Sequence, residues 1–256
     1  LCLCGVLFLM RIRITLENSV NKNIVLPVHY NYLLQSFIYS NIDEKLASFL
    51  HDKGFIYEKR SFKMFVFSRI SSNQFRLTEN KGYLYLGSNI YFYLSSPLDQ
   101  FISQFAEHLF KKHTFNLWEN SLVLRDIFVL PEPEFKENAK IKMLSPVTVY
   151  STLYKEDKRK TYYYSPFEKE FALLLKENLV KKYISFYKHP INFDFEIKPC
   201  SVNKNLEKII FYKSTVIKGW LGNYSLKSTP EIIKFSYHTG LGAKNSQGFG
   251  MFEICS

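Results

Sequence analysis

A glycine-rich segment near the end of the chain is the first part of the sequence that could hold a charged ligand. Between a predicted helix and a predicted strand, eleven residues include Gly240, Gly242, Gly248 and Gly250. The segment is not a P-loop, because no Gly-Lys-Ser/Thr follows, and Asn245 stands where a dinucleotide fingerprint needs its third glycine. Exposed backbone N–H groups, together with Lys244, Asn245 and Ser246, would suit phosphates. The ordinary alternative is that Gly240 ends a helix and that a hairpin-like loop follows.

The cysteines and histidines show no spacing typical of a metal site. None of the four cysteines belongs to a C-x-x-C pair, and the six histidines form no His-x3-His pair. No paired carboxylates for acid–base work stand out, because Glu132 and Glu134 belong to a proline-rich linker. The sequence therefore predicts neither a metal nor another cofactor, and the cysteine usage is typical of a reduced, cytoplasmic protein.

Positive charge is the main compositional feature. The chain has 34 Lys and Arg against 23 Asp and Glu, a formal net charge of +11, which favours a polyanionic partner. The best single candidate surface is 155–160, a charged excursion next to three consecutive tyrosines. We expect its cations, Lys155, Lys158, Arg159 and Lys160, to contact phosphates while neighbouring tyrosines stack on bases. A single basic cluster of this kind is most often only a solvated surface.

The first half of the chain predicts helices that alternate with antiparallel strands. Period-two alternation indicates strands at 10–17, 62–68, 74–78, 83–86, 89–94 and 122–130. Helical spacing of apolar residues indicates helices at 30–40, at 43–53 and from residue 97. Asn41 or Asp43 can cap the second helix and Gly54 can end it. The resulting order is β-α-β-β-α-β.

The second half repeats this order after the linker Pro131-Glu132-Pro133-Glu134. Strands are predicted at 140–149, 192–198, 208–212, 215–221 and 250–255, and helices at 166–183 and 230–238. The predicted fold is α+β, with two tandem ferredoxin-like (RRM-like) domains at 10–132 and 139–256. Residues 1–9 are interpreted as an upstream extension, since the first regular strand begins at Met10. No apolar run reaches the roughly 18 residues that a membrane helix needs, so no membrane partner is expected.

The glycine spacing G-L-G-x5-G-F-G, after a helix and before a short last strand, resembles that of a known family. This is the family of CRISPR repeat-processing endoribonucleases, the Cas six family of the RAMP superfamily. The similarity covers the chain from about Met10 to its end, and it includes the segments at 33–39, 45–51, 144–147 and 167–171. It implies two ferredoxin-like domains and metal-independent cleavage of repeat RNA in a long precursor, which releases guide RNAs.

The resemblance also implies a catalytic triad. Family members with such a triad place a tyrosine on the first helix, a histidine after the next helical segment and a lysine on the following strand. Tyr39, His51 and Lys63 match these places. Twelve residues on one straight helix would separate Tyr39 and His51 by ~18 Å, so a turn is required between them. Lys53, Lys59 and Arg60 stay open as alternatives to Lys63.

The chemistry fits attack by the 2′-hydroxyl of the RNA on its own phosphate, which yields a 2′,3′-cyclic phosphate and a 5′-hydroxyl. Such a reaction needs a base, an acid and a cation beside the phosphorane. We expect His51 to be the base, Tyr39 to orient or protonate and Lys63 to stabilise charge, although the roles of His51 and Tyr39 could be exchanged.

Two other functions stay open from the sequence. The first is a non-catalytic RNA-binding RAMP subunit of an effector complex, and the second is a ferredoxin-like protein whose charge serves only a protein interface. The expected partner is CRISPR repeat RNA. Other Cas proteins and a second copy of the chain stay open as further partners.

Overall fold

The N-terminal half is built on a five-stranded antiparallel sheet. The computed structural model describes residues 10–79, 82–155 and 158–255, so the predicted extension at 1–9 lies outside the described residues. The sheet has the order β5-β8-β1-β10-β9. Its strands are β1 (Met10–Asn18), β5 (Val66–Phe67), β8 (Asn89–Ser96), β9 (Phe115–Leu117) and β10 (Asn120–Val129). Helices α1 (Asn31–Tyr39) and α3 (Asp99–Lys111) pack on it through a shared core that includes Ile14, Phe37 and Phe105.

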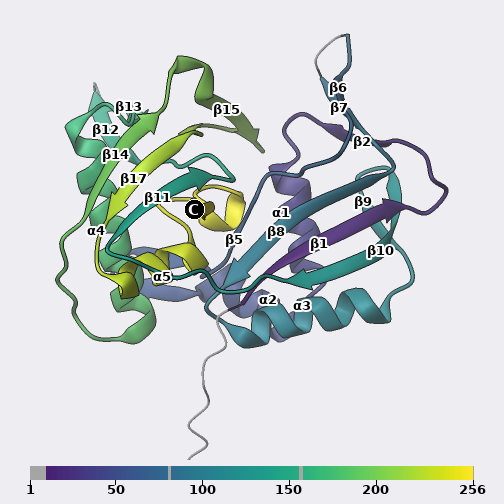
Figure 1. Cartoon of the computed structure of the whole chain (residues 1–256), viewed down its shortest axis with the longest axis horizontal. Coiled ribbons are helices and arrows are strands. Elements are labelled where there is room, and N and C mark those ends of the chain that lie inside the picture. Colours follow the sequence, from purple (N-terminus) through teal and green to yellow (C-terminus); the bar gives the residue numbers. More distant parts are fainter. Residues whose placement is uncertain (1–9, 80–81, 156–157, 256) are drawn as a thin grey trace, which may run out of the picture.

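The C-terminal half repeats this arrangement with four strands in the order β14-β17-β11-β18. The strands are β11 (Asn138–Met143), β14 (Glu196–Ser201), β17 (Asn223–Lys227) and β18 (Phe252–Cys255), and the helices are α4 (Lys169–Tyr187) and α5 (Pro230–Thr239). In each half the first and third strands of the β-α-β-β-α-β order lie in the middle of the sheet. The predicted tandem ferredoxin-like α+β fold is therefore confirmed, and Figure 1 shows the two sheets side by side.

Smaller elements extend both halves. The strands β2 (Ile24–Pro27), β6 (Phe75–Leu77) and β7 (Tyr83–Leu86) form a three-stranded sheet that projects beyond β8 in Figure 1. Three hairpins pair β3 (Phe55–Tyr57) with β4 (Arg60–Phe62), β12 (Tyr150–Lys155) with β13 (Lys158–Tyr163), and β15 (Glu207–Tyr212) with β16 (Thr215–Trp220). Short helical turns are α2 (Glu44–Ser48), a π-helical turn (Phe49–Lys53) and two 3-10 turns (Lys204–Leu206 and Asn245–Gln247).

Several predicted elements differ from the observed ones. The strand predicted at 62–68 is broken, because Met64 has a φ of 54° and separates β4 from β5. The strand predicted at 140–149 already ends at Met143. The helix predicted from Pro166 begins only at Lys169, since residues 165–168 form a turn closed by a hydrogen bond from the Glu168 N–H to the Ser165 carbonyl. The strands predicted at 208–212 and 215–221 form a separate hairpin, and the sheet instead takes β17, which the sequence analysis missed.

Buried polar contacts join the two halves. The Arg11 guanidinium of β1 is 2% exposed and donates to the carbonyls of Phe252, at 2.6 Å, and Tyr237. It also lies 3.3 Å from the centre of the Tyr237 ring. Nearby, the buried His238 ring bridges Ser95 and Glu132, each at 3.1 Å. Polar contacts between buried groups therefore cross the boundary between the two halves. Among the helices that the structure describes, we find none with the length and apolarity to cross a membrane.

Candidate active site and RNA-binding surface

Tyr39 lies at the end of α1, where the helix meets the opening between the two halves. The apolar face of α1 is buried in the core through Leu34, Phe37 and Ile38, which turns the half-buried Tyr39 toward the rim. Its ring contacts Phe65 edge-on, with 5.6 Å between ring centres. Burial raises the pKa of the Tyr39 hydroxyl above its ordinary value, so this group holds its proton at neutral pH.

His51 comes back to Tyr39 because the chain turns between the two helical segments, as the spacing required. Asp43 caps α2, since its carboxylate accepts hydrogen bonds from the Lys45 N–H at 2.9 Å and the Leu46 N–H at 3.4 Å. The π-helical turn that follows ends at Gly54, whose φ is 63°. The His51 and Tyr39 rings are then 6.2 Å apart, centre to centre.

The His51 side chain is 77% exposed, and its Nδ1 lies 2.8 Å from Oδ1 of Asp52. This contact fixes one ring nitrogen on a carboxylate, which orients the imidazole and favours the tautomer with its proton on Nδ1. Nε2 is then the nitrogen that can accept a proton from a substrate.

Lys63 completes the group from the segment between β4 and β5. Its Nζ donates to the His51 carbonyl at 2.7 Å and to the Ser61 hydroxyl at 3.1 Å. Burial lowers the pKa of Lys63, and the nearby Asp52 carboxylate opposes this shift. Lys63, the predicted cation, therefore lies beside His51. Arg60, one of the alternatives to it, lines a neighbouring pocket.

The three predicted catalytic residues line one pocket of about 530 Å³, called here the His51 pocket. Both halves contribute to it, because the tip of the β15–β16 hairpin supplies Tyr212 and Lys213. The Tyr212 hydroxyl donates to Oε1 of Gln35, and Nζ of Lys213 lies 4.5 Å from the centre of the Tyr32 ring. Burial raises the pKa of Tyr212 to about 12. Asp52, Tyr212 and Gln35 were not predicted as site residues, and no spacing in the sequence indicates that they meet.

The glycine-rich segment lies next to the His51 pocket, and its four glycines are buried. A Cβ added to Gly250 would lie 1.9 Å from the Leu241 carbonyl oxygen, and one at Gly242 would lie 2.4 Å from that of Thr148. At Gly248 it would meet Phe67 at 2.5 Å, and at Gly240 it would meet the Asn245 amide at 2.6 Å. The four glycines therefore shape the loop by close approach to protein atoms.

The side chains of Asn245 and the buried Lys182 stabilise this loop through hydrogen bonds to its backbone. The Asn245 amide donates to the carbonyls of Leu241, at 3.0 Å, and Phe249, at 2.9 Å. Nζ of Lys182 donates to the Gly240 carbonyl and to Oδ1 of Asn245, both at 2.7 Å. The Asn245 side chain is thus engaged in bonds within the loop, and its predicted contact with phosphate stays a prediction. The polar side chains of Lys244, Ser246 and Gln247 also line a pocket, and Oε1 of Gln247 has no hydrogen-bond partner among the described residues.

A second pocket of about 350 Å³, called here the Asn178 pocket, adjoins the first. The two share Lys63, Ser246 and Gln247, so they form a continuous surface across the glycine-rich loop. Tyr150, the first residue of β12, also lines the Asn178 pocket, and Nζ of Lys244 lies 5.3 Å from the centre of its ring.

The β12–β13 hairpin carries the predicted basic cluster. It begins at the Asn178 pocket and continues to the exposed Lys160 of β13. The side chains of Lys155, Lys158 and Arg159 lie outside the described part of the structure. The cluster thus occupies a hairpin, in the stretch between the predicted strand at 140–149 and the predicted helix at 166–183 where no strand was predicted.

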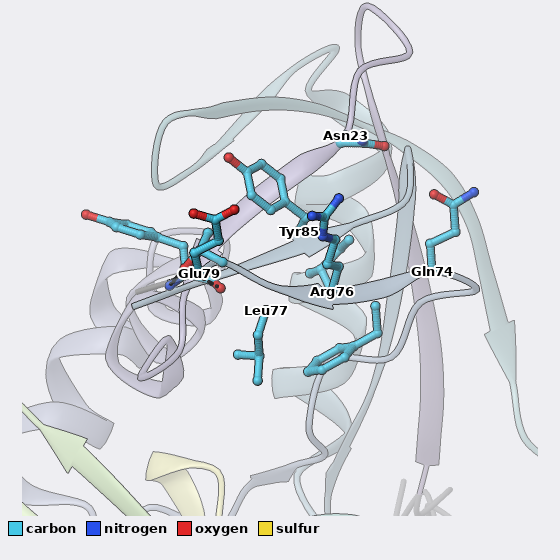
Figure 2. A pocket seen from close by; sticks show the side chains of 10 residues that line it. Asn23, Gln74, Arg76, Leu77, Glu79 and Tyr85 are labelled. Carbon is cyan, nitrogen blue, oxygen red and sulfur yellow. Dashed lines mark hydrogen bonds between the residues drawn. The ribbon is translucent and has the colours of Figure 1, made fainter. Parts of the chain in front are cut away.

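A hollow of about 920 Å³ lies elsewhere, on the β2–β7–β6 sheet, and none of the predicted site residues lines it. Figure 2 shows Leu77 on the opposite side of the hairpin from Tyr85 and Arg76, which are cross-strand partners. Its described lining includes Arg76 and Glu79 but no histidine, lysine or cysteine, so it lacks the acid–base set of the His51 pocket. Within residues 10–79, 82–155 and 158–255, we find no group of three or more His, Cys, Asp or Glu side chains placed to hold a metal ion.

Comparison with known proteins gives matches along nearly the whole chain. Residues 25–128 match the model "CRISPR-associated protein Cas6, N-terminal", and residues 130–254 match "CRISPR associated protein Cas6, C-terminal". The chain is 34% identical to the CRISPR-associated endoribonuclease Cas6 1 of Methanocaldococcus jannaschii, over 93% of this chain and 91% of that protein.

Solved structures agree with these matches. The chain superposes with a TM-score of 0.84 and 27% identity on the product of a Cas6-related gene from Pyrococcus furiosus, over 96% of this chain and 98% of that one. A structure described as a RAMP protein binding different RNA substrates gives a TM-score of 0.82 and 25% identity, over 96% of this chain and all of the other.

Proposed function

The chain belongs to the Cas6 family, and we propose from this that it is an endoribonuclease that cleaves CRISPR repeat RNA in a precursor transcript to release guide RNAs. The observation that carries the proposal is the meeting of Tyr39, His51 and Lys63 in one pocket beside the glycine-rich loop. A net charge of +11 supports a nucleic-acid substrate.

In the proposed mechanism, Nε2 of His51 removes the proton of the 2′-hydroxyl next to the scissile phosphate. Asp52 orients the ring through its contact with Nδ1. The 2′-oxygen then attacks the phosphorus, and the bond to the 5′-oxygen breaks. The products would be a 2′,3′-cyclic phosphate and a 5′-hydroxyl, with no metal in the reaction.

Tyr39 and Lys63 serve the other two needs of this reaction. A tyrosine that keeps its proton can donate it, or a hydrogen bond, to the departing 5′-oxygen. The Lys63 ammonium, already within the pocket, would stabilise charge on the phosphorane. An exchange of the acid and base roles between His51 and Tyr39 stays open in this proposal.

Binding of the RNA would extend beyond the three catalytic candidates. Lys244 and Ser246 of the loop face the shared surface, and Lys213 approaches it from the β15–β16 hairpin. We propose that the chain also contacts phosphates through Lys160 and through the predicted contacts Lys155, Lys158 and Arg159. A cytoplasmic location, association with other Cas proteins and pairing with a second copy stay expectations of the same proposal.

The test is incubation of the purified protein with the CRISPR repeat RNA of its own genome in EDTA. We expect one cut, with a 2′,3′-cyclic phosphate on the upstream product and a 5′-hydroxyl on the downstream product. The same RNA with a 2′-deoxynucleoside at the cut should bind and stay intact, because it lacks the nucleophile. A requirement for Mg²⁺ or a 3′-hydroxyl product would contradict the mechanism. Binding of the repeat without any cleavage would favour the non-catalytic RNA-binding subunit.

A further inference from the structure

Two of the buried polar side chains of α4, Asn178 and Lys182, lie one helical turn apart. Asn178 is 7% exposed and Lys182 is 2% exposed, and the spacing of four residues places them on the same face. They differ in one respect. Lys182 gives hydrogen bonds to Gly240 and Asn245, whereas Oδ1 of Asn178 has no hydrogen-bond partner among the described residues.

An unsatisfied buried amide oxygen is unfavourable, because its lost hydration costs about 1–3 kcal/mol. Buried polar groups in folded proteins nearly always have partners, so the exceptions mark places where a ligand or water is bound. The Asn178 side chain lines the Asn178 pocket, which has room for a group much larger than a water molecule. Oδ1 itself is enclosed in this conformation, so a turn of the Asn178 amide about its last side-chain bond is needed to bring the oxygen to a ligand that carries an N–H or O–H donor.

The surroundings of Asn178 identify the class of this ligand. Lys63, Lys244 and Arg60 line the pocket, so it favours a group that carries negative charge. The aromatic ring of Tyr150 lines it as well. Cations, an aromatic ring and an amide whose oxygen lacks a partner among the described residues together are features that bind a nucleotide, through its phosphate, base face and base edge.

The position of the pocket indicates which nucleotide this is. Lys63, which we place at the scissile phosphate, belongs to both pockets, while His51 lies in only one of them. A phosphate at Lys63 joins two nucleosides, so one would occupy the His51 pocket and its neighbour the Asn178 pocket.

We propose that the Asn178 pocket binds the nucleotide that adjoins the scissile phosphate on the side away from His51, and that the Asn178 amide hydrogen-bonds to the edge of its base. This inference rests on the proposed function. An amide offers an acceptor and a donor side by side, which matches adenine best among the bases. Asn178 would thus be a specificity-determining residue for the position of the cut.

The experiment measures the affinity of uncleavable repeat RNA, with a 2′-deoxynucleoside at the cut. Three RNAs are compared: the intact repeat, and two versions that are abasic at either nucleotide flanking the scissile phosphate. Each is titrated against wild type, Asn178→Ala and the control Asn116→Ala, which removes an exposed asparagine on β9. Asn178→Ala should weaken binding of the intact RNA by about three- to tenfold, the fold-change for one hydrogen bond.

The coupling between residue and base decides the outcome. At one of the two abasic positions, Asn178→Ala should cause no further loss, because the base it would contact is already gone. An equal loss with all three RNAs, or no loss with any, would overturn the assignment of Asn178 while leaving the proposed function intact. Failure of wild type to bind the intact repeat would reject both. If Asn178→Ala does not fold, as judged by thermal unfolding, Asn178→Ser is used in the same comparison.

Discussion

His51 combines two properties that a general base needs, access to substrate and a defined orientation. Its side chain is largely exposed, so RNA can reach it, and Asp52 holds Nδ1 at 2.8 Å. Both partners of this contact are exposed, so the pair adds little to the free energy of folding. Its consequence is chemical, because it occupies Nδ1 and leaves Nε2 to accept a proton in the pocket that Tyr39 and Lys63 also line.

The first prediction separates catalysis from folding at this residue. His51→Ala should lower the cleavage rate by about 10²–10⁴-fold, the usual contribution of general acid–base catalysis, while RNA affinity and thermal stability stay near wild type. Single-turnover cleavage of the repeat measures the rate. His113→Ala is the control, because it removes another exposed histidine that lines neither pocket. If His51→Ala cleaves the repeat at the wild-type rate, His51 is an exposed surface residue and not the general base.

The sequence predicted part of this site and missed the rest for a physical reason. Tyr39, His51 and Lys63 lie within 25 consecutive residues, so the turn before α2 and the β3–β4 hairpin are enough to bring them together. Tyr212 and Asn178 reach the same region from more than a hundred residues away, through the packing of the two halves. No local pattern encodes that packing, and nothing in the sequence distinguishes Lys213 from the other lysines.

At the scale of elements, the glycine-rich loop is set by backbone geometry more than by its composition. Gly240, Gly242, Gly248 and Gly250 all have positive φ, between 70° and 84°. A Cβ would meet backbone oxygens at Gly242 and Gly250 and side-chain atoms at Gly240 and Gly248, so another residue fits only if these neighbours shift. The sequence showed that the chain must turn tightly here. It could not show that the tight approach is to the protein itself.

The second prediction tests this reading of the loop. Gly250→Ala should lower the free energy of unfolding by more than ~2 kcal/mol, because its Cβ would clash with the Leu241 carbonyl and its φ of 84° is unfavourable for alanine. Gly87→Ala is the control, since a Cβ there meets its neighbours at an ordinary 3.5 Å. It should change stability by less than ~1 kcal/mol. Urea unfolding measures both, and equal effects would refute the proposed constraint.

The hydrogen bonds from Lys182 to this loop lead to a third prediction, which concerns the pH dependence of stability. Burial lowers the pKa of Lys182 from 10.5 to about 7. Between these values the unfolded chain binds a proton that the folded chain has released, so stability should rise with pH from about 7 to 10.5. Lys182→Met lacks this group. The stability difference, wild type minus Lys182→Met, should therefore increase by on the order of 1 kcal/mol per pH unit in that range. Urea unfolding at several pH values measures both free energies of unfolding. If the two free energies change with pH in parallel, Lys182 stays charged in the folded protein.

Among the other elements, the predicted and observed positions agree best where the periodic pattern of apolar residues is long. Helices α3 and α5 and the strand β8 lie close to their predicted positions, because several apolar residues repeat at one period. The strand β17 has only five residues and follows Gly222, whose φ of 118° breaks the alternation from β16. Its place in the middle of the sheet is decided by pairing with β11 and β14, which are distant in sequence.

At the scale of the whole molecule, both pockets depend on how the two halves meet. Each is lined by residues of the N-terminal half, such as Lys63, and by residues of the glycine-rich loop in the C-terminal half. Figure 1 shows the C-terminal segment near the boundary between the two sheets. Contacts that fix this boundary therefore also fix the site, although they lie outside it.

Among the contacts between the two halves, we expect those of Arg11 to contribute most to stability. The Leu241 N–H, which would continue the hydrogen bonding of α5, instead donates to the Gly250 carbonyl. The Tyr237 carbonyl is thus an end group of α5, and Arg11 from β1 supplies its donor. One side chain of the N-terminal half thereby caps a helix of the C-terminal half.

The last prediction compares two arginines on β1. Arg11→Met keeps the apolar stem but removes the donors to Tyr237 and Phe252, which leaves buried carbonyls with fewer partners at about 1–3 kcal/mol each. Burial lowers the pKa of Arg11 to about 10, so relief of its desolvation offsets part of this loss. We expect a net loss of about 2 kcal/mol or more in urea unfolding. Arg13→Met, whose side chain is 40% exposed and meets Asp126 at 3.5 Å, should lose less than ~1 kcal/mol. If the two variants lose the same amount, the halves are held together by apolar packing and not by Arg11.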